Sequence, residues 1–293
     1  MLAYIQFPSW IRPEIVPFLP IRWYGLMYLV AFAITYLLFS YQLSERKLAP
    51  EKDLVLDMFF WAIIGLLVGA RAFAVTIYDP TGYYFRHPLQ IILPFSMVDG
   101  KLRLTGIAGM SYHGGLVGVI VALVIFMKVK KIDLLDWGDM LVAGIPLGYT
   151  FGRLGNFING ELYGRITKVP WGIVFPHAES FPAKEQWVKD FASAVGLPVS
   201  GSGLVNLPRH PSQLYEASFE GAVLWLILWL IVRRRRPYKG FVIACYVLGY
   251  GVFRFLMSTP GNPTRGSGTP SPSCLWTTPC TSSAPSTSPP ARS

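Results

Sequence analysis

The sequence predicts an all-α polytopic membrane protein with about six transmembrane helices and a small extracytoplasmic head domain. Of the 293 residues, 52% are hydrophobic and only 14% are charged. A soluble domain usually carries about 25% charged residues. Several apolar runs also reach the roughly 20 residues that a helix needs to cross a bilayer. A long polar segment between two of these runs predicts the head.

Residues 1–20 contain no basic segment and no cleavage site, so we interpret them as an interfacial segment and not as a signal peptide. Transmembrane helices 1–4 are expected within 21–158, and helices 5 and 6 within 215–257. The individual expected spans are 23–40, 54–77, 107–127, 134–158, 215–232 and 241–257.

The segment 159–214 is too long for a connector in a compact bundle, so it is the expected head domain. Within it, the letters G-I-V-F-P predict a strand at 172–176, and K-E-Q-W-V-K-D-F-A predicts a helix at 184–192. A Gly/Ser turn is expected at 200–203.

Basic residues gather in the loops after the first, third and fifth expected spans. They are Arg46, Lys47, Lys52, Lys128, Lys130, Lys131, Arg233, Arg234, Arg235, Arg236 and Lys239. Because these loops alternate along the chain, they are expected on one side, which the positive-inside rule makes the cytoplasm. The N-terminus is then extracytoplasmic. The arginine run 233–236 is interpreted as a topology anchor at anionic lipid heads, so the net charge of +10 does not indicate nucleic-acid binding.

The last 36 residues have a different composition, because 27 of them are Ser, Thr, Pro or Gly. Such a segment buries too little surface to offset its ordering entropy, so 258–293 is predicted to be disordered. The three cysteines, Cys245, Cys274 and Cys280, show no metal or redox spacing. No metal, no cofactor and no cysteine nucleophile is expected.

The segment 152–165, G-R-L-G-N-F-I-N-G-E-L-Y-G-R, ends an apolar run but carries several polar side chains. On a helix, Arg153, Asn156 and Gly160 fall on one face. The glycines at 152 and 155 leave room for a bulky group beside that face. This pattern is typical of either a binding site or a glycine-rich packing face.

Arg153 needs a partner, because an arginine at this depth costs about 2.5–3.5 kcal/mol on insertion scales. A lipid phosphate is one candidate. An internal carboxylate is the other, and Glu216 and Glu220, one turn apart, are candidate counter-ions. The lipid interpretation requires an opening toward the bilayer, and arginines sealed by carboxylates would exclude it.

Other polar residues lie in or near the apolar runs, namely Arg71, His113, Arg254, Tyr24 and Tyr250. The histidine follows Ser-Tyr and precedes two glycines, so it is either a hydrogen-bonded packing residue or a proton-transfer group. Three arginines and one histidine spread over four spans predict a polar cavity.

Five motifs occur in a fixed order: R-W-Y-G-L-M-Y (22–28), Y-H-G-G-L-V-G (112–118), the block 152–165, R-H-P-S-Q-L-Y-E (209–216) and G-Y-G-V-F-R-F (249–255). Together they resemble prolipoprotein diacylglyceryl transferase over about residues 1–257. The resemblance implies a bacterial inner-membrane enzyme. It would transfer the diacylglyceryl group of phosphatidylglycerol to the cysteine thiol of a prolipoprotein lipobox, releasing glycerol 1-phosphate.

The resemblance also implies roles for individual residues. Arg153 would bind the lipid headgroup, Arg254 would steady the leaving phosphate, and His113 would act as general base or orient the lipid. Further substrate-binding residues are Tyr24, Asn156, Asn159, Gly160, Glu161, Gly164 and Tyr250. Expected partners are phosphatidylglycerol, prolipoprotein signal peptides with a lipobox cysteine, and membrane lipids.

The sequence departs from that family after the last motif. Members continue with an acidic residue, another arginine, a Pro-Asp pair and a seventh span, whereas here Ser-Thr-Pro-Gly follows at 258–261. The break resembles a shifted reading frame and would remove one wall of the lipid cavity. A membrane transporter and a non-catalytic lipid-binding scaffold are the alternative functions, although no internal repeat of the transporter kind is visible.

Overall fold

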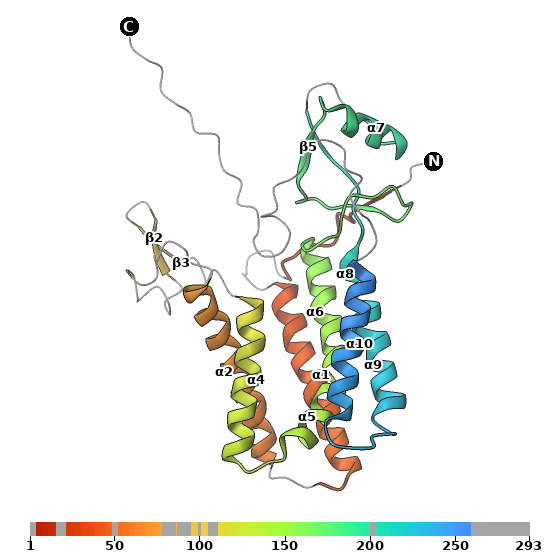
Figure 1. Ribbon diagram of the computed structural model, residues 1–293. Helices are drawn as coiled ribbons and strands as arrows, with labels where there is room; N and C mark the ends of the chain where they lie inside the picture. Colours follow the sequence, from red (N-terminus) through yellow and green to blue (C-terminus); the bar gives the residue numbers. More distant parts are fainter. Residues whose placement is uncertain are drawn as a thin grey trace. The chain divides into compact units, whose positions relative to one another are not determined.

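The computed structural model describes residues 4–15, 22–48, 52–77, 86, 95–98, 101–104, 111–199 and 203–258 (Figure 1). The predicted disordered tail, apart from Ser258, and residues 200–202 of the expected Gly/Ser turn lie outside these residues, so both remain predictions.

Helices account for most of the described chain. They are α1 (Trp23–Glu45), α2 (Lys52–Thr76), α4 (Tyr112–Val129), α5 (Leu134–Val142), α6 (Ile145–Asn159), α7 (Gln186–Ala194), α8 (Ser212–Glu216), α9 (Leu224–Ile227) and α10 (Phe241–Ser258). Two π-helical stretches, η2 (Ala217–Val223) and η3 (Leu228–Val232), join α8, α9 and the following loop into one continuous rod.

Strands are short and occur in three pairs. The pairs are β1 (Ile5–Gln6) with β4 (Ile173–Val174), β2 (Phe95–Val98) with β3 (Lys101–Leu104), and β5 (Ser180–Pro182) with β6 (Leu204–Asn206). The first pair is parallel and the other two are antiparallel. The predicted strand at 172–176 and helix at 184–192 are therefore confirmed by β4 and α7. The N-terminal segment, predicted to be interfacial, adds β1 to the head.

Four helical segments are long and apolar enough to cross a membrane: Trp23–Glu45, Asp53–Thr76, Tyr112–Val129 and Ser212–Val232. The apolar helix at Phe241–Met257 is shorter. These segments confirm the polytopic helical fold.

The expected fourth span, 134–158, is wrong as a single helix. The chain turns at Ala143 and Gly144, which separate α5 from α6. Pro146 lies in the first turn of α6, where its missing N–H costs no helical hydrogen bond. The Gly-Ile-Pro sequence was thus a helix-start signal inside an apolar run.

Helices α2 and α4 meet at four glycines. A Cβ on Gly118 would lie 2.0 Å from the carbonyl oxygen of Gly65, and one on Gly69 would lie 2.4 Å from that of Gly114. The two backbones therefore touch, as in membrane helix pairs with glycines four residues apart. Gly114, beside His113, is consequently a packing residue.

The three basic loops lie at one end of the helices. Carboxylates of α5 pair with basic residues from two of these loops, those that contain Arg46 and Arg236. Asp136 accepts Arg46 at 3.2 Å and Arg236 at 2.5 Å, and Asp139 accepts Arg236 at 2.8 Å. The expectation that these loops share one end is confirmed. Which side of a membrane this end faces remains a prediction.

The arginine run 233–236 is more than a topology anchor. Arg233 pairs with Glu45 and lies 4.0 Å from the ring of Trp229. Arg236 pairs with α5, whereas Arg234 and Arg235 are exposed. Two of the four cations are thus internal partners that hold α10 and its preceding loop to α1 and α5.

Candidate functional site

Arg153 lies on α6, one turn after Tyr149. Its Nε donates to the Tyr149 hydroxyl at 2.7 Å and lies 2.9 Å from Glu216 Oε2. The guanidinium also covers the Tyr149 ring, 4.9 Å from its centroid. Among the described residues these polar contacts all involve Nε, which leaves the two terminal nitrogens for another acceptor.

Arg254 reaches the same carboxylate from α10. Its Nη1 lies 3.1 Å from Glu216 Oε1 and 3.5 Å from Glu220 Oε1. Glu216 therefore bridges the two arginines, with one oxygen facing each. Figure 1 shows α6 and α10 with the α8–α9 rod that supplies both carboxylates.

The π-helical stretch η2 brings Glu220 against α6. Tyr149 donates its hydroxyl proton to Glu220 Oε2 at 2.6 Å. A Cβ on Gly221 would lie 2.1 Å from Thr150 Oγ1, so a glycine is required for this close approach. π-Helical turns are rare and often occur at functional sites.

The partner of Arg153, which the sequence left open, is an internal carboxylate in this structure. The prediction that Glu216 and Glu220 are counter-ions is therefore confirmed for the two arginines. They are not sealed, however, because 35% of the Arg254 side chain and 18% of the Arg153 side chain remain exposed. An opening toward the bilayer remains a prediction.

The end of α6 holds a second set of predicted residues. Gly160 has φ 67° and ψ 30°, a left-handed conformation that ends the helix. After this turn the Glu161 side chain lies against the end of α6, where Asn156 and Asn159 donate to its Oε1 at 3.0 and 3.3 Å. Gln213 of α8 donates to the Glu161 carbonyl at 2.6 Å.

Tyr24 joins this second set from α1. Its hydroxyl lies 2.9 Å from that of Tyr28 and close to the Asn156 amide. A Cβ on Gly155 would lie 3.5 Å from the Tyr24 Cα and 3.2 Å from the Met27 Cβ. The expected room beside Gly155 is therefore wrong, because α1 fills it.

Three glycines next to site residues do face open space. A Cβ on Gly25, Gly152 or Gly251 would meet no atom within 4 Å. They adjoin Tyr24, Arg153 and Tyr250 along the chain. The expected room beside Gly152 is thus confirmed.

His113 is the second residue of α4 and is exposed, with its ring 5.7 Å from that of Tyr112. Ser111 caps this helix by accepting the N–H of Gly114 at 3.1 Å. Tyr112 is close enough to Tyr250 for an electrostatic interaction between them. This turn of α4 therefore lies near the α10 side of the site.

Tyr250 packs edge-on against Tyr149, with ring centroids 6.1 Å apart, and so belongs to the arginine network. Gly164 lies in the head instead, where its N–H donates to the His210 carbonyl at 2.9 Å. A Cβ on Gly164 would lie 3.0 Å from that of His210. Burial lowers the pKa of the His210 imidazole, so this side chain is neutral at neutral pH.

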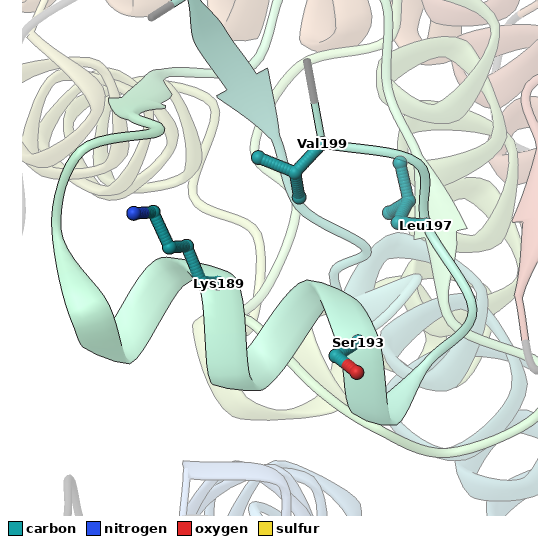
Figure 2. A pocket seen from close by; sticks show the side chains of 4 residues that line it. All are labelled: Lys189, Ser193, Leu197 and Val199. Atoms are coloured by element: carbon teal, nitrogen blue, oxygen red, sulfur yellow. The ribbon is translucent and has the colours of Figure 1, made fainter. Parts of the chain in front are cut away.

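The head contains an open hollow beside α7, away from the predicted site residues. Figure 2 shows that Lys189 and Ser193 of α7 line it with Leu197 and Val199. One cation and one hydroxyl without a carboxylate do not form an acid–base site. Nor do three His, Cys, Asp or Glu side chains gather as a metal site within the described ranges.

Sequence reasoning missed Tyr149 and Gln213. Tyr149 precedes Arg153 by four residues, a spacing that places two helical side chains together, so a signal existed. Gln213 is three residues before Glu216 and fully buried. Its role depends on the turn after α6, which the sequence does not specify.

Together, the apolar helices and the partly exposed arginine–carboxylate network between them define a polytopic integral membrane protein. The model of the family described as prolipoprotein diacylglyceryl transferase matches residues 13–260. The chain belongs to this family.

Similar proteins carry the name phosphatidylglycerol–prolipoprotein diacylglyceryl transferase. The relative from Treponema denticola is 49% identical over 284 residues, covering 92% of this chain and 83% of the relative. The relative from Treponema pallidum is 50% identical over 266 residues, covering 86% and 79%. The one from Chlorobaculum tepidum is 42% identical over 252 residues, covering 85% and 78%.

Proposed function

We propose that this chain transfers the diacylglyceryl group of phosphatidylglycerol to the lipobox cysteine thiol of prolipoproteins and releases glycerol 1-phosphate. Family membership supports the reaction. The structural observation that carries it is the convergence of Arg153 and Arg254 on one partly exposed centre. A phospholipid is the anionic substrate that a membrane supplies to such a centre.

Arg153 holds the lipid phosphate. Its Nε donates to the Tyr149 hydroxyl at 2.7 Å, which fixes the plane of the guanidinium. The terminal nitrogens then present two parallel N–H donors, the geometry that suits phosphate oxygens. Lysine has no such planar pair of donors.

Arg254 stabilises the leaving group. When the bond between the glycerol carbon and the phosphate oxygen breaks, the phosphate gains a second negative charge. A guanidinium already positioned in a dry site stabilises that charge without reorganisation, which is often the largest catalytic term. The 35% exposure of Arg254 leaves access for the phosphate.

The lipid lies along the open side of Gly25, Gly152 and Gly251. Their missing side chains leave space next to both arginine-bearing helices and next to Tyr24. Tyr250 belongs to the arginine network. The second set at the end of α6, which consists of Asn156, Asn159, Gly160 and Glu161, binds the lipid beside it, and Gly164 permits the close packing of the head turn. His113 orients the lipid from the start of α4.

The acceptor thiol comes with the second substrate. A membrane-anchored signal peptide would present its lipobox cysteine at the extracytoplasmic side, next to the head. The protein then lies in the bacterial inner membrane with its N-terminus extracytoplasmic. Accessibility of single cysteines introduced near residue 6 and residue 131 to an impermeant reagent tests this orientation, and labelling of 131 from outside would reverse it.

Purified chain incubated with phosphatidylglycerol and a lipobox peptide tests the reaction. The expected products are a thioether-linked diacylglyceryl peptide and free glycerol phosphate. A lipid transporter or a lipid-binding scaffold forms neither product, so their absence under conditions in which the lipid is bound would refute the proposed function.

A further inference from the structure

Glu216 contacts both of the arginines that are proposed to bind the lipid phosphate. Its two oxygens face Arg153 and Arg254 at 2.9 and 3.1 Å, and together they carry a single negative charge. The two non-bridging oxygens of a phosphodiester also share one charge. The carboxylate and the phosphate therefore compete for the same two cations.

The charge count changes when the lipid binds. Without lipid, the network contains two guanidinium groups and two carboxylates, Glu216 and Glu220, and is neutral when all are ionised. A bound phosphodiester adds a third anion to two cations in a partly dry site. The extra negative charge favours transfer of a proton to one of the carboxylates, because like charges at short range favour the protonated form of one of them.

We propose that Glu216 is the base that removes the proton of the acceptor thiol, and that phosphate binding to the arginines makes it available for this role. This inference rests on the proposed function. Glu216 borders the opening with an 11% exposed side chain, whereas the Glu220 side chain is fully buried. Glu216 thus reaches the thiol, and Glu220 is a positioning residue behind it.

The chemical step balances. The S–H bond breaks and its proton moves to a Glu216 oxygen, while the sulfur forms a bond to the terminal glycerol carbon. The bond between that carbon and the phosphate oxygen breaks, and its electron pair leaves with the phosphate. Glu216 later returns the proton to the glycerol phosphate or to water, and its carboxylate again binds the arginines.

This arrangement protects the enzyme from premature thiol ionisation. In the absence of lipid, the two oxygens of Glu216 are occupied by Arg153 and Arg254. A thiol with an ordinary pKa near 8.5 then stays protonated. Thiolate forms only when the electrophile is already in place, so activation of the nucleophile is coupled to lipid binding.

The test compares two nucleophiles in the full-length protein with phosphatidylglycerol. One lipobox peptide carries cysteine, and the other carries selenocysteine, whose selenol ionises at neutral pH without a base. With cysteine, E216Q should lower kcat by about 10²–10⁴-fold, the usual contribution of a general base. With selenocysteine, E216Q should stay within about threefold of the unchanged protein.

The ratio of the two rates is independent of the folded fraction, so it remains informative if E216Q folds poorly. E216D, which keeps a carboxylate, should recover part of the cysteine rate. E45Q removes the charge from another arginine–glutamate pair, Glu45 with Arg233, and should change neither rate.

Two outcomes would overturn the inference. One is an E216Q protein with normal turnover of the cysteine peptide, and the other is an equal loss with both peptides, which marks a structural role. A rescue by selenocysteine in H113Q and not in E216Q would assign the base to His113. If the unchanged protein forms no product although it binds lipid, the proposed function itself fails.

Discussion

Two buried charge networks can be compared in this molecule. One joins α5 to the basic loops around Asp139, and the other joins α6, η2 and α10 around Glu216 and Glu220. Each contains one carboxylate whose side chain is fully buried, Asp139 in the first and Glu220 in the second. They differ in how many hydrogen bonds the most buried carboxylate accepts.

Asp139 is fully satisfied. It lies 2.8 Å from Arg236 Nε, and it accepts the backbone N–H groups of Gly240 and Ile243 at 2.8 and 3.0 Å. Glu220 accepts Tyr149 on one oxygen, while its buried Oε1 has no hydrogen bond within the described chain. The contact that Oε1 does make is with Arg254, at 3.5 Å. The comparison therefore sets a fully hydrogen-bonded structural network against the proposed reactive centre.

The largest difference in catalytic rate should appear when one arginine in each network is replaced by lysine, which lacks a planar guanidinium. Arg153→Lys should lower thioether formation by about 10²–10³-fold, because an ammonium cannot hold phosphate through two fixed donors. Arg236→Lys, the matched change in the α5 network, should leave the turnover of folded protein unchanged. Steady-state rates normalised to active protein measure both, and equal rates for the two variants would erase the distinction.

The two networks should also differ in how much their fully buried carboxylates contribute to stability. Replacing each carboxylate by the amide of the same shape tests this. Asp139→Asn should cost about 3–5 kcal/mol, because it leaves Arg236 with a weakened partner and turns an NH2 group toward backbone donors. Glu220→Gln should cost less, about 1 kcal/mol, because an amide oxygen can still accept the Tyr149 hydroxyl and only the long 3.5 Å contact with Arg254 is weakened. Denaturation in detergent measures the free energy of unfolding of both variants. A larger loss for Glu220→Gln than for Asp139→Asn would contradict the structural role assigned to Asp139.

The open side of the reactive centre can be tested with glycine substitutions. Gly152→Leu should lower the rate on the order of tenfold by displacing the lipid, with little change in melting temperature. Gly155→Leu should instead destabilise the protein, because its side chain would strike Met27 and Tyr24 of α1. If Gly152→Leu is as unstable as Gly155→Leu, the space beside Gly152 is not open in the membrane.

The smallest effect is expected at the exposed edge of the α5 network. The hydrogen bond from Lys239 lowers the pKa of Asp133 below its ordinary value of 3.8. Since the folded-state pKa is the lower one, the pair stabilises the protein above about pH 4 and loses this contribution as the pH falls further. Asp133→Asn should therefore remove a slight acid sensitivity, and melting temperatures at pH 3 and pH 6 that change equally in both proteins would refute this.

The sequence was sufficient for the features that depend on composition and on short-range spacing. Apolar runs located the membrane helices, and basic loops predicted which ends meet. Helical periodicity placed Arg153 and Asn156 on one face. The counter-ions of Arg153 were among the candidates because Glu216 and Glu220 lie one turn apart.

Other features depend on contacts between distant segments, which no local pattern specifies. The bridging of Arg153 and Arg254 by one carboxylate requires the register between α6, α8 and α10. The break before Pro146 had a local signal, but hydrophobicity across 134–158 concealed it. The π-helical turn around Glu220 depends on the contact of Gly221 with Thr150, and the sequence alone does not reveal it.

The pairing of β1 with β4 has a consequence for the synthesis of the protein. Residues 5 and 6 meet residues 173 and 174, so the start of the chain has no strand partner until more than half of it has left the ribosome. At about 5–20 residues per second, this interval lasts roughly 10–30 s. During that time the first helices enter the bilayer while the N-terminal strand waits, and the head closes only after α6 has been inserted.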